Sequence, residues 1–259
     1  MPSAVNAFDL EASEYDDRFT RSRIGTLLRE ATWRRFDARF QPGQRVLELN
    51  CGTGEDAVHL ARRGIEVLAT DASVQMLEQA SRKAEQAGLA ALVRVRRLPL
   101  EELDSLSDGP FDGAISNFGG LNCAADLSQV ASALAELLRP GAALAACVMG
   151  PVVPWEWAWY LGRLQPSKAF RRLRPGGVDW RGLRIRYPSV WKLKRALAPD
   201  FELNRVSALG ALIPPPYAES WAFRHPGLVD LLSRWERRFE TVPPLPWLAD
   251  HYLAEFTRR

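Results

Sequence analysis

The residues best suited to chemistry lie in a glycine-rich turn and at the end of the apolar run that follows it. The segment Val46–Asp56 reads VLELNCGTGED, so an apolar run ends in a turn that contains Gly52 and Gly54. Glycine lacks a Cβ and accepts positive φ, which lets a ligand approach the backbone, and the helix expected next offers free N–H groups. Asp71 stands seventeen residues after Gly54, where a carboxylate can accept both hydroxyls of a ribose. This spacing predicts a cofactor that contains adenosine.

Two cofactor classes fit this turn. Residues 52–57 match the Gly-x-Gly-x-x-Ala dinucleotide pattern, which keeps an NAD(P)-dependent oxidoreductase as an alternative. Glu48, however, would repel a pyrophosphate and would attract the ammonium of a methionine moiety, directly or through water. Glu55 and Asp56 already occupy the positive end of the helix dipole. The sequence also lacks a Tyr-x-x-x-Lys pair, so we favour S-adenosylmethionine.

Short apolar runs alternate with segments of helical period, which predicts an α/β fold. We expect a Rossmann-like, seven-stranded, mostly parallel sheet with helices on both faces and a cap insertion rich in tryptophan and arginine. The expected strands are Val46–Leu49, Ile65–Thr70, Leu92–Arg96, Phe111–Ser116, Ala143–Val148, Phe201–Leu209 and His251–Thr257. The expected helices are Glu55–Arg63, Val74–Ala87, Leu127–Leu138 and Ser189–Ala198, with a helical excursion over Tyr217–Glu240.

The 259 residues suit one large domain with insertions. We divide this domain into N-terminal lid helices over 1–40, a cofactor-binding core over 41–150, and cap or substrate insertions over 151–187 and 210–248. Residues 151–250 hold eight of the nine tryptophans. Because tryptophan and proline build rigid pockets, the cap favours a bulky, partly apolar ligand, and we expect irregular and helical structure after the fifth strand.

The whole set of motifs resembles the class I S-adenosylmethionine-dependent methyltransferases, over about residues 44–150. The matching pieces are the glycine-rich segment 46–54, Thr70-Asp71-Ala72-Ser73 with Met76-Leu77, the strand Phe111–Asn117, and the Arg139-Pro140-Gly141 turn. The resemblance is greatest to the small-molecule branch with ubiquinone/menaquinone-type and glycine/sarcosine-type enzymes. Two segments depart from the family pattern: Asn50 replaces a usual Gly or Asp, and Arg97–Leu100 replaces an acidic adenine-contact segment.

The resemblance implies a role for each matching residue. Glu48, Asn50 and Gly52 would line the methionine part of S-adenosyl-L-methionine, with Gly54 completing the turn. Asp71 would hold the ribose, and the adenine would lie between Ala72 and Met76 on one side and Leu98 or Leu100 on the other. Asn117 would face the methionine end or the substrate, and Tyr15 would cover the cofactor. The product of the reaction would be S-adenosyl-L-homocysteine.

Three candidates for a general base follow from the residue types. His225 lies in the expected late helical excursion, within reach of the substrate mouth, and His251 begins the expected last strand. The resemblance places Tyr15 near the cofactor. His59 is interpreted as structural because it lies inside the helix after the glycine turn. Each candidate also has a purely structural interpretation, as a capping, packing or surface residue. Displacement at a sulfonium methyl needs chiefly an aligned nucleophile and exclusion of water, so a base is helpful but not obligatory.

The cap has an unusual charge. Residues 163–195 carry eleven basic side chains and one acid, Asp179, whereas the whole chain has a net charge of +3. Such a stretch, preceded by Trp155–Leu161, is compatible with a solvated basic face, an anionic substrate or peripheral contact with a membrane surface. It does not favour nucleic acid, because the basic run is confined to one insertion.

Other features limit the alternatives. No apolar run approaches the roughly 18 residues of a membrane span, and the start lacks the pattern of a signal peptide. Three scattered cysteines predict neither disulfides nor a metal site, so we expect a cytoplasmic protein. The resulting hypothesis is a methyltransferase that acts on O, N or C of a bulky, partly apolar and possibly anionic small molecule. A non-catalytic protein that binds S-adenosylmethionine is the other alternative.

Overall fold

A seven-stranded sheet forms the centre of the computed structural model, which describes residues 8–259. Its strand order is β3-β2-β1-β4-β5-β9-β8. The first five strands along the chain run parallel, and β9 pairs antiparallel with both β5 and β8. The predicted fold class is confirmed. The strands are β1 (Arg45–Leu49), β2 (Glu66–Asp71), β3 (Val93–Arg97), β4 (Phe111–Ser116), β5 (Leu138–Met149), β8 (Phe201–Leu209) and β9 (His251–Arg258).

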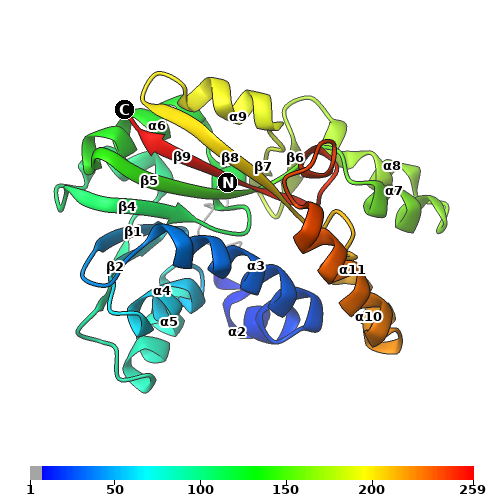
Figure 1. The fold of residues 1–259 in the computed structure, drawn as a ribbon, viewed down its shortest axis with the longest axis horizontal. Coiled ribbons are helices and arrows are strands. Elements are labelled where there is room, and N and C mark those ends of the chain that lie inside the picture. Colours follow the sequence, from blue (N-terminus) through cyan, green and yellow to red (C-terminus); the bar gives the residue numbers. More distant parts are fainter. Residues whose placement is uncertain (1–7) are drawn as a thin grey trace.

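Helices cover both faces of this sheet (Figure 1). One face carries α3 (Arg23–Arg39), α4 (Glu55–Arg62) and α5 (Val74–Gln86), and the other carries α6 (Leu127–Leu137) and α9 (Val190–Leu197). Side-chain caps fix where four of them begin: Ser22, Ser73, Asp126 and Ser189 accept backbone N–H groups of the first turns of α3, α5, α6 and α9. Each face therefore buries its own apolar core, and the strand ends remain free for a site.

The predicted lid segment divides into two parts. The short α2 (Ala12–Tyr15) and a π-helical turn (Asp16–Thr20) lie near the carboxyl ends of the strands. In contrast, α3 packs against α4 and β5 and is tied to the sheet by Arg35, which donates hydrogen bonds of 2.9 and 3.1 Å to Glu255 on β9. Within residues 8–40, the cavity is therefore covered by Phe8 and by Tyr15 of α2, and α3 is part of the scaffold.

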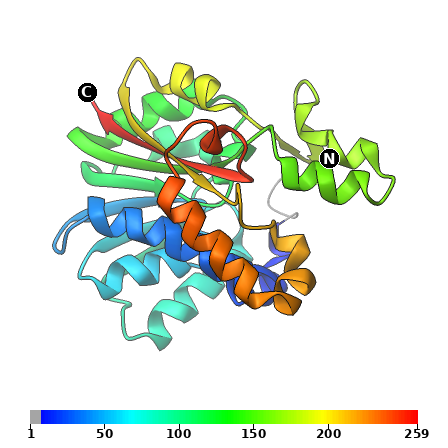
Figure 2. The same ribbon diagram turned by 45° about the vertical axis from the view of Figure 1, so that its right-hand side comes forward.

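The cap after β5 contains α7 (Pro154–Leu161), α8 (Pro166–Ala169) and a β-hairpin of β6 (Val178–Trp180) and β7 (Leu183–Ile185). Figure 2 shows α7 and α8 projecting beyond the sheet. The hairpin corrects our expectation of irregular and helical structure. Its two-residue loop, Arg181-Gly182, has positive φ at both positions, as in a type I′ turn, and its strands are too short for an alternating pattern to be recognised.

The predicted helical excursion over Tyr217–Glu240 is two helices, α10 (Glu219–Arg224) and α11 (Pro226–Phe239). Pro226 disfavours helical backbone at His225, so the chain changes direction there. Five 3-10 turns complete the described chain: η2 (Leu100–Ser105), η3 (Gly120–Cys123), η4 (Arg171–Leu173), η5 (Pro216–Ala218) and η6 (Leu245–Trp247). Within residues 8–259, no helix has both the length and the apolar character needed to cross a bilayer.

Candidate cofactor and substrate site

A cavity of about 390 Å³ lies where the carboxyl ends of β1, β2 and β4 meet. The strand order reverses between β1 and β4, which is where open parallel sheets bind ligands. Eight residues proposed from the sequence line this cavity: Tyr15, Asn50, Gly52, Asp71, Ala72, Met76, Leu100 and Asn117. Glu48, Gly54 and Leu98 lie beside it without forming its wall.

The two glycines of the turn have different surroundings. Gly52 has φ of 53°, and a Cβ built there would meet no atom within 4 Å. Gly54 has φ of 80°, and its Cβ would lie 2.7 Å from the Ala80 Cβ on α5. Gly52 therefore opens the backbone toward the cavity, whereas Gly54 allows α4 and α5 to pack closely.

Asp71 is held in a fixed orientation at the end of β2. Its Oδ2 accepts a hydrogen bond of 3.0 Å from the Gly52 N–H, and its Oδ1 accepts one of 2.9 Å from the Ser73 N–H. Burial raises the pKa of Asp71, and the backbone N–H groups that point at it partly offset this effect. A carboxylate has about four acceptor sites, so the group retains capacity for the hydroxyls of a ligand.

Two buried oxygens beside the glycine turn lack hydrogen-bond partners among the described residues. Glu48 is only 1 % exposed, and its Oε2 is unpaired. Burial, together with the charge of Asp56, raises the pKa of Glu48 well above its usual value, although Arg29 opposes this rise. The Oδ1 of Asn50, whose side chain lies against Gly120, is also unpaired. Unsatisfied buried acceptors are costly, so this pair fits a ligand that brings donors, such as an ammonium group.

Asn117 is fixed by a buried cluster behind the cavity wall. Its Nδ2 donates to Asp56 (2.9 Å) and to the Thr32 Oγ1 (3.1 Å). Asp56 also accepts from Arg29 (2.9 Å) and from the indole of Trp33 (2.6 Å). The Asn117 amide donor is therefore already engaged within the protein. Its two hydrogen bonds anchor the end of β4 to α3 and α4, and this anchoring holds Asn117 in the cavity wall.

The other half of the cavity was not predicted from the sequence. The hairpin and its neighbours supply a mostly apolar wall, in which the Phe8 and Trp180 rings lie 5.4 Å apart. This wall comes from six separate segments, each with too few apolar residues to stand out. The residues that line this half are Phe8, Glu101, Phe118, Gly119, Gly120, Cys123, Met149, Arg171, Val178, Trp180, Leu183, Ile185 and Tyr187.

The polar groups of the wall are few. Burial raises the pKa of Tyr15 to about 12, so its phenol stays protonated and acts as a donor rather than as a base. Burial also raises the pKa of Tyr187. Arg171 is the one cation among the lining residues, and its Nε lies 2.8 Å from Glu156. With Asp71 and Glu101 also in the wall, the lining is not basic.

The basic cap residues are largely engaged elsewhere. Arg172 is buried and lies 2.8 Å from Glu156 on α7 and 2.5 Å from Asp250, which immediately precedes β9. Arg181 pairs with Glu11 at 2.7 Å, and Arg186 donates to the Ala124 carbonyl at 3.2 Å. Arg172 therefore attaches the cap to the residue that precedes β9, and Arg181 attaches the hairpin to the N-terminal segment.

None of the three histidines is among the residues that line the cavity. His225 is exposed, and its ring centroid lies 5.0 Å from that of Trp221. His251 is buried, with Nδ1 2.9 Å from Asp250 and its ring edge-on to Phe118 at 5.7 Å. His59 stacks on Trp33 at 4.1 Å, which agrees with the structural interpretation.

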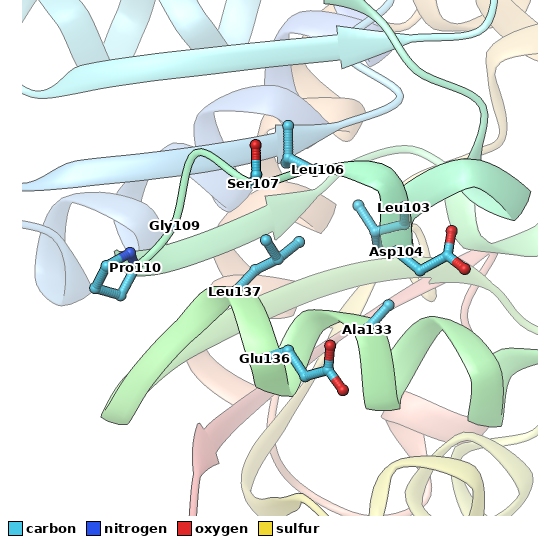
Figure 3. A pocket seen from close by; sticks show the side chains of 9 residues that line it. All are labelled: Leu103, Asp104, Leu106, Ser107, Gly109, Pro110, Ala133, Glu136 and Leu137. Atoms are coloured by element: carbon cyan, nitrogen blue, oxygen red, sulfur yellow. The ribbon is translucent and has the colours of Figure 1, made fainter.

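A second cavity, of about 340 Å³, lies between η2 and α6 (Figure 3). Leu103, Leu106 and Leu137 line it together with the carboxylates of Asp104 and Glu136. Gly109 and Pro110 in its wall precede β4, whereas Asn117 in the larger cavity follows β4. This cavity therefore lies at the opposite edge of the sheet and contains none of the predicted site residues.

Comparison with known proteins agrees with this geometry. Residues 46–141 match the model of a methyltransferase domain family. The demethylmenaquinone methyltransferase of Corynebacterium kroppenstedtii is 32% identical over 172 residues, which cover 62% of this chain and 68% of the relative. The ubiquinone biosynthesis O-methyltransferase of Psychrobacter cryohalolentis is 32% identical over 110 residues, or 42% of this chain and 41% of the relative.

Among solved structures, the geranyl diphosphate C-methyltransferase of Streptomyces coelicolor, in complex with S-adenosyl-L-homocysteine, has the same fold. The TM-score is 0.58 at 15% identity, covering 89% of this chain and 79% of the other. The chain belongs to the class I S-adenosylmethionine-dependent methyltransferases. Its cofactor is S-adenosylmethionine, as predicted, rather than a nicotinamide. It is accordingly an enzyme of the kind that methylates small molecules.

Proposed function

We propose that this enzyme methylates an oxygen, nitrogen or carbon atom of a bulky, largely apolar small molecule bound against the β6–β7 hairpin. One observation carries the proposal. A single cavity is lined on one side by Gly52 and Asp71 and on the other by Trp180 and Ile185. A cofactor in the first half would thus adjoin an acceptor in the second.

The cofactor half supports an assignment for each group of S-adenosylmethionine. Asp71 would accept hydrogen bonds from the ribose hydroxyls. The unpaired Glu48 and Asn50 oxygens would receive the ammonium, the former directly or through water. Ala72, Met76 and Leu100 would contact the adenine, and Tyr15 would cover the cofactor. When bound, the cofactor supplies a methyl group that its sulfonium already activates.

The acceptor half favours an apolar ligand with one polar end. Its cation, Arg171, is paired with Glu156, so a full negative charge on the acceptor would have no free partner among the lining residues. We therefore favour a neutral acceptor over an anionic one. Its polar end would face Arg171 and Tyr187, and its body would contact Trp180, Leu183 and Ile185.

The residues of this site favour catalysis by alignment. Tyr15 remains protonated, and the histidines lie outside the lining, so we assign proton abstraction to neither. Holding a nucleophile in line at about 3 Å and excluding water can lower a barrier by roughly 7–11 kcal/mol. The hairpin and Phe8 would provide this exclusion of water.

Two measurements test the proposal. Calorimetric titration with S-adenosylmethionine, S-adenosylhomocysteine and NADH should give micromolar binding of the first two only. Transfer of radiolabelled methyl should then be found with bulky phenols, hydroquinones or amines and should fall at least tenfold in Ile185→Asp. The variant Val74→Asp, changed at an exposed position of α5, should retain activity. Equal turnover of small carboxylates, or full activity of Ile185→Asp, would contradict an apolar acceptor half.

A further inference from the structure

The apolar side of α11 faces solvent. Leu228, Leu231 and Trp235 lie three and four residues apart, on one side of the helix, and they are 44%, 42% and 53% exposed. Phe223, just before this helix, is 80% exposed. The buried positions of α11 are instead Val229 and Glu236. Val229 is buried and Leu232 and Phe239 are half-buried, so one border of the apolar side packs inward. The stripe of Leu228, Leu231 and Trp235 faces solvent, although a surface helix usually turns such a stripe toward the core.

The carboxylate of Glu236 explains why the helix cannot rotate. It is 4% exposed and accepts hydrogen bonds from the backbone N–H groups of Gly210 (2.7 Å), Leu212 (2.7 Å) and Ile213 (3.0 Å). Turning the apolar stripe inward would break all three bonds and leave those N–H groups without partners. The outward direction of the stripe is therefore fixed by the fold.

The charge around the stripe is positive. Every carboxylate of residues 219–240 is engaged within the molecule. Glu219 accepts the N–H groups of Arg23 and Ile24, Asp230 pairs with Arg23, and Glu240 pairs with Arg34 and Arg205. In the part of the chain that the structure describes, the arginines of this segment have no carboxylate partner. They are Arg224, Arg234, Arg237 and Arg238.

We propose that α10 and α11 dock on an anionic lipid surface. Leucine, phenylalanine and tryptophan on one side with arginine at the border is the composition of an interfacial helix. The unpaired arginines supply charge complementarity to an anionic surface. Two copies meeting through this face would bring like charges together, which disfavours self-association. Figure 2 shows α11 along the outside of the molecule, open to such a surface.

The sequence pattern placed a possible membrane contact at Trp155–Leu161 and the basic stretch that follows it, whereas the exposed apolar residues lie on α11. Trp155 packs against Trp221, and Trp159 against Tyr217, with ring centroids 6.0 and 5.6 Å apart. Trp155 therefore attaches the cap to α10 and Trp159 attaches it to η5, whereas Trp157 packs against Phe170 inside the cap. The exposed tryptophan of the surface proposed to dock on lipid is Trp235 of α11. This helix lies outside the basic stretch of residues 163–195.

Cosedimentation of the full chain with vesicles tests the proposal. Vesicles that contain phosphatidylglycerol should bind the protein, and pure phosphatidylcholine vesicles should bind it at least tenfold less well. The double variant Leu231→Gln/Trp235→Ser should lose binding. Arg234→Gln should weaken it about fivefold, the effect expected for one arginine near an anionic surface.

Matched controls lie on α9. Trp191 is 65% exposed and lies among basic residues, so Trp191→Ser and Arg195→Gln should bind vesicles as the parent chain does. Circular dichroism would establish that each variant is folded. Equal binding to both vesicle types would overturn the proposal, as would loss of binding in the α9 variants alone. A concentration-dependent dimer that the α11 double variant abolishes, without vesicle binding by the parent chain, would assign the face to a second copy instead.

Discussion

The backbone N–H of Gly52 donates a hydrogen bond of 3.0 Å to Oδ2 of Asp71. This bond joins the glycine turn after β1 to the end of β2. Gly52, which opens the backbone toward the cavity, is thus hydrogen-bonded to Asp71, the carboxylate proposed to hold the ribose. A change at either position is expected to affect both parts of the cofactor site.

Replacing Asp71 with alanine should weaken the binding of S-adenosylmethionine by roughly 1.5–3 kcal/mol, the usual value for hydrogen bonds to a charged group. Isothermal calorimetry measures this directly. Asp104→Ala, at the cavity on the opposite edge of the sheet, is the control and should bind normally. Unchanged binding in Asp71→Ala would mean that the ribose lies elsewhere.

Replacement by alanine should impair cofactor binding at Gly52 and fold stability at Gly54. Gly52→Ala places a methyl group in open space, so it should destabilise the fold by only about 1–2 kcal/mol, the effect of positive φ, while impairing cofactor binding. Gly54→Ala adds a clash with Ala80 to the same backbone effect and should be the less stable of the two. Thermal unfolding and calorimetry of both variants separate these effects. The reverse order of stability would contradict the assigned surroundings.

Cofactor affinity should depend on pH through Glu48. Burial raises the pKa of this group in the ligand-free protein, and a bound ammonium favours its ionised form. Raising the pH upward from the ordinary glutamate pKa of about 4.3 should therefore strengthen the binding of S-adenosylmethionine as Glu48 ionises. Calorimetry over a series of rising pH values should give a slope for the parent chain and a nearly flat line for Glu48→Gln. The same slope in both proteins would assign the effect to another group.

Tyr15 should contribute as a wall and a donor. Because its pKa is about 12, the pH profile of methyl transfer should show no tyrosine ionisation below about pH 10. Tyr15→Phe should retain the shape of the parent profile, whereas Tyr15→Ala should bind the cofactor more weakly through loss of the ring. A changed pH profile of methyl transfer in Tyr15→Phe would instead indicate that Tyr15 acts as a general base.

The buried cluster around Arg172 should control acid stability. Burial alone would raise the pKa of Asp250, but Arg172 and His251 outweigh this effect and hold the pKa well below its usual range. The resulting stabilisation is full above the unfolded-state pKa of about 3.9 and is lost as the pH falls below it.

Arg172→Met leaves two buried carboxylates without this partner and should destabilise the fold by about 3–5 kcal/mol. Urea unfolding at about pH 7 and about pH 3 measures both effects, and the exposed Arg195→Gln is the matched control. A variant as stable as the parent chain at neutral pH would exclude this role for Arg172.

Sequence patterns predicted the cofactor half well because its determinants are local. The glycine turn, Asp71 and the strand ends are fixed by backbone conformation and by the order of parallel strands. As a result, eight proposed residues meet in one cavity. The strands β4 and β8 have the predicted bounds, and most other strand ends differ by one residue. The exception is β5, which begins five residues early, at Leu138, and so includes the predicted Arg139-Pro140-Gly141 turn.

The acceptor half could not be predicted because its members meet only through tertiary contacts. Phe8, Met149, Trp180 and Tyr187 come from separate segments, and the hairpin strands have three residues each. The charge pattern of the cap was equally uninformative, since Arg172 and Arg181 pair with acids far away in the sequence. The role of Glu236 was also hidden, because a carboxylate that caps a distant turn leaves no local pattern.

The Arg172 cluster limits how this enzyme can exchange parts with its relatives. Glu156 lies in the cap, and Asp250 adjoins the central sheet, so one guanidinium joins the acceptor wall to the scaffold that carries the cofactor. A cap grafted from another enzyme would remove Arg172 from Asp250, and a grafted scaffold would leave Arg172 with Glu156 as its remaining partner. New acceptor specificity is therefore better obtained by changing hairpin side chains than by exchanging the cap, unless all three charged residues move together.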